Sequence, residues 1–395
     1  MSSLHYKFRR LNSIILGTVF FLSGMLKLMD PVGSGLIVND YFKFLHIGFL
    51  GFAAKWTAFI LASIETLLGI ALLAGVFRKL SAIVTTFLLG SFTLLTVSLV
   101  IFNPEMDCGC FGEAIHLSHS QTLFKNIILC VIAAATYLPT TNFGLAPKRK
   151  YVAFAIICAT TVAFAIYSQT HLPLMDFTDF VTGSELMASQ EADLGSAGGQ
   201  QTAFIYAKDG IEQSFSLEDL PDSTWAFVRT EISHNKDLSY GEVFPILSIS
   251  DAEGNYFDEI AVDGNVLAVS VYEPSRIGDR RWEMIADAIH TALDEGFTPL
   301  LLSSSPEGVP TELEDYLYFS DYKTLITFNR SNGGYIYLSD GEIIRKWPGG
   351  DGPEHRFYNK LQGKLPEEIM LDKNTQDRLT SQAILLFSFA VLLLM

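Results

Sequence analysis

Long apolar runs constrain the fold of this chain more than any other feature. A transmembrane helix needs about 20 predominantly apolar residues, and apolar residues make up 49% of the 395 residues. Five runs reach or approach that length, at residues 11–29, 53–76, 80–102, 123–138 and 151–169. A sixth run, at residues 383–395, is short for a full span, because a helix rises about 1.5 Å per residue. We therefore predict a multi-pass α-helical membrane protein.

Basic residues indicate how the predicted spans are oriented. They form three clusters: Lys7, Arg9 and Arg10; Arg78 and Lys79; and Lys148, Arg149 and Lys150. Alternating topology places all three clusters on the same side, which the positive-inside rule identifies as cytoplasmic. In a bacterium this predicts an inner-membrane protein with a cytoplasmic N-terminus. The loop between the third and fourth spans and residues 172–379 would then face the periplasm.

The charge of the chain narrows the range of its partners. The formal net charge is −16, and most of the acidic residues lie in the outward region. Nucleic acid is excluded as a partner, because binding to phosphates needs a basic surface. We expect a periplasmic protein as partner or substrate, and membrane lipid around the apolar helices.

The outward region divides into two parts. Residues 172–241 are predicted to form a linker subdomain with a β-hairpin of residues 201–207 and 213–217. The Asp209-Gly210 dipeptide between these runs is typical of tight hairpin turns. Pro221-Asp222-Ser223 predicts the start of a helix, with Ser223 as its cap.

Residues 242–366 alternate between strand and helix patterns. A helix is predicted at residues 282–293 and ends near Gly296. Strands are predicted at residues 245–249, 266–272, 299–302, 325–328, 335–338 and 343–346. This order indicates one small mixed α/β domain.

Two of the four cysteines lie in one short loop, Cys108-Gly109-Cys110, between two predicted spans. Glycine permits the bend that a bridge between such close cysteines needs. A strained bridge in an oxidising compartment would be easily reduced, as thiol exchange requires. The pair is therefore a candidate redox centre, and a structural bridge or two unreactive thiols are the alternatives.

Other polar residues near the membrane give weaker signals. His116 and His119 follow Cys108 and Cys110, and two thiolates with two imidazoles can hold zinc or copper. The Cys-x-Cys spacing is tighter than in the usual zinc fingers, so a metal site is not favoured. Cys130 and Cys158 lie within spans, where cysteine usually behaves as a small apolar residue.

Lys27 and Glu65 are charged residues within predicted spans. Glu65 falls near the middle of the second span, where an ionised group costs several kcal/mol. We expect it to face the bundle interior, protonated or paired, with either a structural role or a role in handling protons or a quinone. Lys27 lies near the outward end of the first span, where its side chain could snorkel to the surface.

The membrane part resembles the DoxX/MauE-like four-helix membrane proteins of the Bacteroidetes type. The resemblance rests on residues 21–31, on residues 64–69, and on residues 108–112 followed by Lys125-Asn126. It implies a four-helix membrane domain at residues 1–140, with an added transmembrane helix at residues 141–171 and a C-terminal hydrophobic helix at residues 379–395. MauE is associated with maturation of a disulfide-rich periplasmic enzyme, so the resemblance implies thiol–disulfide chemistry.

The strand and helix order of residues 242–366 resembles a thioredoxin-like domain of the TlpA and peroxiredoxin branch. The active-site cysteines of that family would lie within residues 273–281, which contain no cysteine. Its cis-proline would lie near residues 330–335, where Gly333 and Gly334 stand. The resemblance thus implies a catalytically degenerate thioredoxin-like domain that binds partners.

Two classes of function follow from the sequence. In the first, the protein is a thiol–disulfide oxidoreductase in which Cys108 and Cys110 exchange disulfides, with electrons passing to a quinone in the bundle. In the second, it is a membrane-anchored scaffold without enzymatic activity. A metal-binding loop is the third and weakest interpretation.

Overall fold

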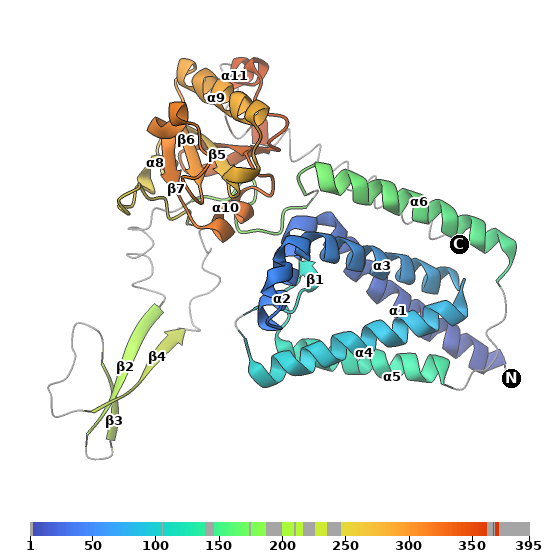
Figure 1. Ribbon diagram of the computed structural model, residues 1–395. Helices are drawn as coiled ribbons and strands as arrows, with labels where there is room; N and C mark the ends of the chain where they lie inside the picture. Colours follow the sequence, from blue (N-terminus) through green and yellow to red (C-terminus); the bar gives the residue numbers. More distant parts are fainter. Residues whose placement is uncertain are drawn as a thin grey trace. The chain divides into compact units, whose positions relative to one another are not determined.

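The computed structural model describes residues 3–104, 106–138, 146–173, 175–186, 200–208, 211–215, 226–234, 246–361, 366 and 368–370. The described residues fall into two compact units, one within residues 1–178 and one within residues 179–370 (Figure 1). The predicted C-terminal helix at residues 379–395 lies outside the described residues.

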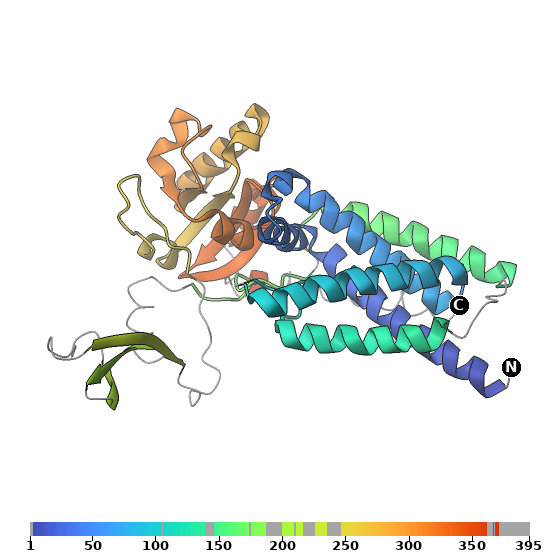
Figure 2. The same ribbon diagram turned by 60° about the horizontal axis from the view of Figure 1, so that its bottom comes forward.

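The first unit is a helical bundle. Its elements are α1 (Ser3–Met29), α2 (Pro31–Phe44), the 3-10 helix η1 (Gly48–Ala53), α3 (Ala54–Ala74), α4 (Arg78–Phe102), the short strand β1 (Cys110–Glu113), α5 (His119–Tyr137) and α6 (Lys148–Thr170). Five helical segments are long and apolar enough to cross a membrane, as the sequence predicted. In both views α4 and α5 run side by side (Figure 1, Figure 2).

Helices α1 and α3 pack unusually closely because glycines stand where they meet. A Cβ atom added at Gly69 would collide with the backbone of Phe21, and one added at Gly24 would collide with Thr66. Small residues permit such close approach between helices in membranes, where packing drives helix association. Leu16, Phe20 and Leu72 complete the buried contact on either side.

Because of this contact, we expect two glycine substitutions to differ in their effect on the stability of the bundle. Gly69→Ala is expected to destabilise the bundle by about 1–3 kcal/mol, the usual cost of overpacking. Gly90→Ala in α4 is the matched control, because nothing lies within 4 Å of the added Cβ. Thermal unfolding of both variants in detergent measures the difference, and equal unfolding temperatures would contradict the account.

The second unit contains a five-stranded sheet in the order β7-β6-β5-β8-β9. Its strands are β5 (Asn265–Val271), β6 (Thr298–Ser303), β7 (Leu317–Phe319), β8 (Gly334–Ser339) and β9 (Glu342–Trp347). Strands β5, β6 and β7 are parallel, whereas β8 is antiparallel to β5 and β9 is antiparallel to β8. The strands predicted at residues 266–272, 299–302, 335–338 and 343–346 are confirmed.

Helices cover both faces of this sheet. One face packs through Leu267 and Val269 against α9 (Asp279–Asp294) and α11 (His355–Leu361). The other face packs through Val266 and Ala268 against α8 (Glu259–Val262) and α10 (Tyr322–Phe328). The 3-10 helices η2 (Pro274–Arg276) and η3 (Thr311–Tyr316) complete the unit. A mixed α/β domain separate from the membrane helices is thus confirmed.

Two strand predictions in this unit are wrong. Residues 325–328 lie in helix α10, because Asp321 caps the backbone N–H groups of Lys323 and Thr324 and starts a helix there. Residues 246–249 form no strand, and the Ile249 N–H donates to the side chain of Asp258. Ser250, just beyond, makes isolated bridges to Tyr256 and Phe319.

A three-stranded sheet lies between the membrane helices and the five-stranded sheet in the sequence. Its strands β2 (Gln200–Lys208) and β3 (Ile211–Phe215) pair antiparallel, with Lys208 opposite Ile211, so the predicted hairpin is confirmed. Residues 226–234 form the strand β4 and pair with β2. The helix predicted after Ser223 is therefore wrong, and Ser223 itself lies outside the described residues.

Candidate functional site

The two ends of the bundle carry different side chains. At one end Arg10 donates to the carbonyl of Leu72 and Lys150 donates to that of Ala74, at 3.0 and 2.9 Å. The basic clusters predicted to share one side thus share one end. At the other end lie the loop between α4 and α5 and the exposed aromatic residues Phe49, Phe52 and Trp56. Of these, tryptophan is a residue type that is enriched at membrane–water interfaces.

The cysteine loop folds back onto α2 through a turn at Gly109. Gly109 has a φ of +60°, and its carbonyl accepts from the N–H of Gly112 at 3.2 Å. A Cβ at Gly109 would collide with Ile37 of α2, so glycine is required there by both conformation and space. The hydroxyl of Tyr41 donates to the carbonyl of Cys108 at 2.8 Å.

The two loop cysteines have different environments. Both are free thiols, Cys108 is buried, and Cys110 is half-buried. Burial raises the pKa of the Cys108 thiol, while the hydroxyl of Thr122 and the charge of Lys125 act in the opposite direction. Cys110 is thus the more exposed of the two thiols.

Both cysteines line one apolar cavity of about 220 Å³ inside the bundle. Its walls come from α1, α2, α3, α4 and α5, and they include Phe20, Phe42, Leu61, Phe92 and Leu129. Its polar lining includes Ser23, Lys27, Lys125 and Asn126. A mostly apolar cavity with a few converging polar groups is the usual form of a small-molecule site.

Lys27 and Glu65 form a buried ion pair at the wall of this cavity. The Lys27 Nζ lies 2.8 Å from Oε1 and 2.9 Å from Oε2 of Glu65. Glu65 is 0% exposed and Lys27 is 8% exposed, so Lys27 points into the bundle and does not snorkel outward. The expectation that Glu65 faces the interior and is paired holds in the structure.

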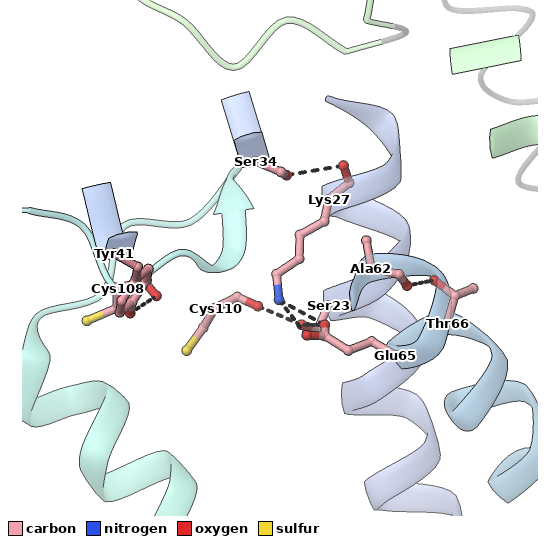
Figure 3. A network of polar contacts seen from close by, with 9 residues as sticks. All are labelled: Ser23, Lys27, Ser34, Tyr41, Ala62, Glu65, Thr66, Cys108 and Cys110. Atoms are coloured by element: carbon pink, nitrogen blue, oxygen red, sulfur yellow. Dashed lines mark hydrogen bonds and ion pairs between the residues drawn. The ribbon is translucent and has the colours of Figure 1, made fainter. Parts of the chain in front are cut away.

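Ser23 connects this ion pair to the cysteine loop. Its hydroxyl oxygen lies 2.6 Å from Glu65 Oε2 and 2.6 Å from the carbonyl oxygen of Cys110 (Figure 3). The Ser34 hydroxyl, from α2, donates to the carbonyl of Lys27 at 3.2 Å. The two groups of residues predicted separately, the thiols and the intramembrane charges, are therefore parts of one site.

The two histidines contact other groups of their own loop. His116 Nδ1 lies 3.2 Å from the carboxylate of Asp107, and His119 Nε2 lies 2.9 Å from the carbonyl of Met106. Within the described part of the chain, no three residues among the His, Cys, Asp and Glu side chains are grouped to hold a metal ion. Cys130 of α5 contacts Thr93 at 3.5 Å and does not line the cavity.

Sequence reasoning missed α2, which supplies Tyr41 and Ile37 to the site. The signal for this helix is Asp30-Pro31. Asp30 accepts from the N–H of Gly33 at 2.9 Å, and proline stands at the first helical position. This pairing of a cap with proline is typical of a helix start. Ser23 was also missed, although it lies within residues 21–31, which carry the family resemblance.

Comparison with known proteins agrees with the membrane architecture. Residues 7–139 match the family model of the methylamine utilisation protein MauE, and residues 200–233 match a domain of unknown function (DUF8463). The chain is 30% identical over 173 residues to protein TlpB of Flavobacterium psychrophilum, covering 42% of this chain and 46% of that relative. The chain thus spans less than half the length of that relative. No solved structure matches.

Proposed function

We propose that this multi-pass membrane protein, whose residues 7–139 are a MauE/DoxX-like membrane domain, performs thiol–disulfide exchange in the maturation of periplasmic proteins. The observation that carries the proposal is that Cys108 and Cys110 both line an apolar cavity beside a buried ion pair. The positive-inside rule supports placing these thiols at the periplasmic side of the inner membrane, away from the basic clusters.

The different burial of the two thiols suggests their roles. The Cys110 thiolate attacks a substrate disulfide, so that one S–S bond breaks and a mixed disulfide forms. Cys108 then attacks Cys110, which releases the substrate as a dithiol and leaves a Cys108–Cys110 bridge. The reverse sequence oxidises a substrate dithiol with the bridge. The turn at Gly109 supplies the bend that such a bridge requires.

The cavity suits an acceptor of the quinone class. Phe20, Phe92 and Leu129 offer an apolar lining for a flat ring, and Lys27 and Asn126 offer hydrogen-bond donors to its carbonyl oxygens. When bound there, a quinone would supply a two-electron acceptor for the cysteine pair. The loop holds the two thiols at the cavity wall, and the apolar lining disfavours polar molecules in the cavity.

We further propose that the mixed α/β domain is a thioredoxin-like domain that binds the partner protein. This rests on the strand–helix–strand unit β5–α9–β6 followed by the antiparallel pair β8 and β9. The segment that would carry the family's cysteines contains η2 and the start of α9, and it presents Glu273 and Arg276, paired at 2.8 Å. A charged surface without a thiol can select a partner but cannot exchange disulfides with it.

Mixed-disulfide trapping tests the proposed function. In cells that express Cys108→Ala, the remaining Cys110 thiol is expected to retain a periplasmic partner as a disulfide-linked complex, since no second thiol resolves it. The converse Cys110→Ala variant should trap much less. Blots under reducing and non-reducing conditions identify the complexes, and Cys130→Ala provides the control. If neither variant captures a partner and both remain functional in the cell, the protein is a scaffold.

A further inference from the structure

We propose that Lys27, Glu65 and Ser23 form a proton relay that serves the Cys108–Cys110 cavity. The inference rests on the proposed function and adds to it a path for protons. Lys27 would exchange protons at the cavity wall, and Glu65 and Ser23 would be positioning residues that act through their neighbours.

The hydrogen bonds of the Ser23 hydroxyl indicate where a proton resides. A hydroxyl donates one hydrogen bond, yet the Ser23 oxygen lies 2.6 Å from both Glu65 Oε2 and the Cys110 carbonyl oxygen. When Glu65 is ionised, both neighbours are acceptors, and one of these close contacts has no hydrogen. When Glu65 carries a proton, it donates to Ser23, and Ser23 donates to Cys110. The geometry therefore points to a proton resident on Glu65.

Lys27 can supply that proton without changing the charge of the site. Its Nζ contacts both carboxylate oxygens of Glu65 at 2.8 and 2.9 Å, so a proton shift converts an ion pair into a neutral pair. Burying two charges is costly even when they are paired, and the neutral pair avoids that cost. Lys27 lines the cavity, whereas Glu65 is wholly buried behind it.

Among the titratable groups around the cavity, Glu65 is the one suited to hold the proton of the relay. Tyr41 of α2, Lys125 of α5 and the two loop cysteines line the cavity, and none of its described lining residues carries a carboxyl group. The ammonium of Lys125 lies 4.8 Å from the centre of the Phe111 ring. Asp30, at the end of α1, caps α2. Glu65 is thus the carboxylate in direct contact with both the cavity lysine and the serine that reaches Cys110.

The balance of the reaction requires such a relay. Oxidation of the Cys108–Cys110 dithiol breaks two S–H bonds, forms one S–S bond, and releases two electrons and two protons. An acceptor of the quinone class takes up both electrons and both protons. Glu65 returns its proton to Lys27, the Lys27 ammonium then gives a proton to the acceptor at the cavity wall, and a proton released from the thiols restores Glu65. Two such passages carry both protons.

The test uses the full-length protein in lipid nanodiscs, with a short-chain benzoquinone as the oxidant. In the wild type, the infrared spectrum of the reduced protein is expected to contain a band from a protonated carboxyl group. Glu65→Gln should abolish this band, slow quinone-driven oxidation of the cysteine pair at least tenfold, and flatten its pH profile. Ser23→Ala should slow oxidation as well. Ser63→Ala is the control, because that hydroxyl bonds within α3 to Phe59.

Redox titration of the cysteine pair against dithiol buffers tests the proposed function independently of the relay, because this titration needs no quinone. If the pair titrates normally while Glu65→Gln and Ser23→Ala keep the wild-type rate and pH profile, the relay is overturned and the proposed function stands. If the wild type shows no carboxyl band, the relay is overturned too. If the pair does not titrate at all, both fall. Ser23→Ala keeps the test decisive should Glu65→Gln fail to fold.

Discussion

Replacing either Cys108 or Cys110 by alanine is expected to reduce disulfide exchange by the purified protein to the uncatalysed background. A single thiol can form a mixed disulfide but cannot resolve it within the chain, so turnover stops after one event. The remaining cysteines cannot substitute, because Cys130 does not line the cavity and Cys158 lies in α6. The measurement is the rate of oxidation of a dithiol peptide by the protein in detergent.

Two matched controls accompany this prediction. Cys130→Ala and Cys158→Ala should retain the wild-type rate, and the doubly substituted Cys130→Ala/Cys158→Ala protein should do so too. The account is contradicted if Cys108→Ala and Cys110→Ala both keep substantial turnover while folded, since exchange would then occur without the pair.

Lys27→Met is expected to destabilise the membrane domain by about 1–3 kcal/mol, because it leaves the carboxyl group of Glu65 buried without its partner. Replacing both residues, as Lys27→Met/Glu65→Leu, should recover most of this loss, because an apolar pair of similar size leaves no buried polar group unsatisfied. Unfolding in a detergent of graded denaturing strength, followed by helical circular dichroism, measures both variants.

The stabilities of the single and double variants show whether Lys27 and Glu65 act as a pair. If Lys27→Met unfolds at the same point as the wild type, Glu65 has another way to be satisfied and the ion pair does not hold the helices together. If the double variant is less stable than Lys27→Met alone, the two residues contribute separately to packing.

The membrane spans could be predicted because they depend on the length and hydropathy of single segments, which the sequence states directly. The conformation of residues 325–328 could not, because a short apolar run suits a strand and a buried helix equally. There the deciding group is Asp321, whose side chain caps α10. Asp321 stands four residues before this apolar run, and it is a helix-start signal that the periodicity of the run itself does not contain.

The residues of the site could be predicted, but their grouping at one cavity could not. Sequence reasoning identified Cys108, Cys110, Lys27 and Glu65 one by one, from their residue types and positions. It could not place them at one cavity, because Ser23, which touches both Glu65 and Cys110, comes from a segment 87 residues away from Cys110. Nor could it show that Cys108 is buried, since that depends on the turn at Gly109 and on contact with α2.

Cys108 and Cys110 are predicted to be an exchanging redox pair, and a redox titration can show whether they are. The full-length protein is equilibrated with dithiol and disulfide buffers of graded potential, the thiols are alkylated, and mass spectrometry reports the state of each cysteine. We predict a two-electron transition confined to Cys108 and Cys110, at a potential above about −300 mV, where exchanging disulfides lie. A potential well below that value would indicate a structural bridge, and the absence of any transition would indicate unreactive thiols. Either result would contradict the account.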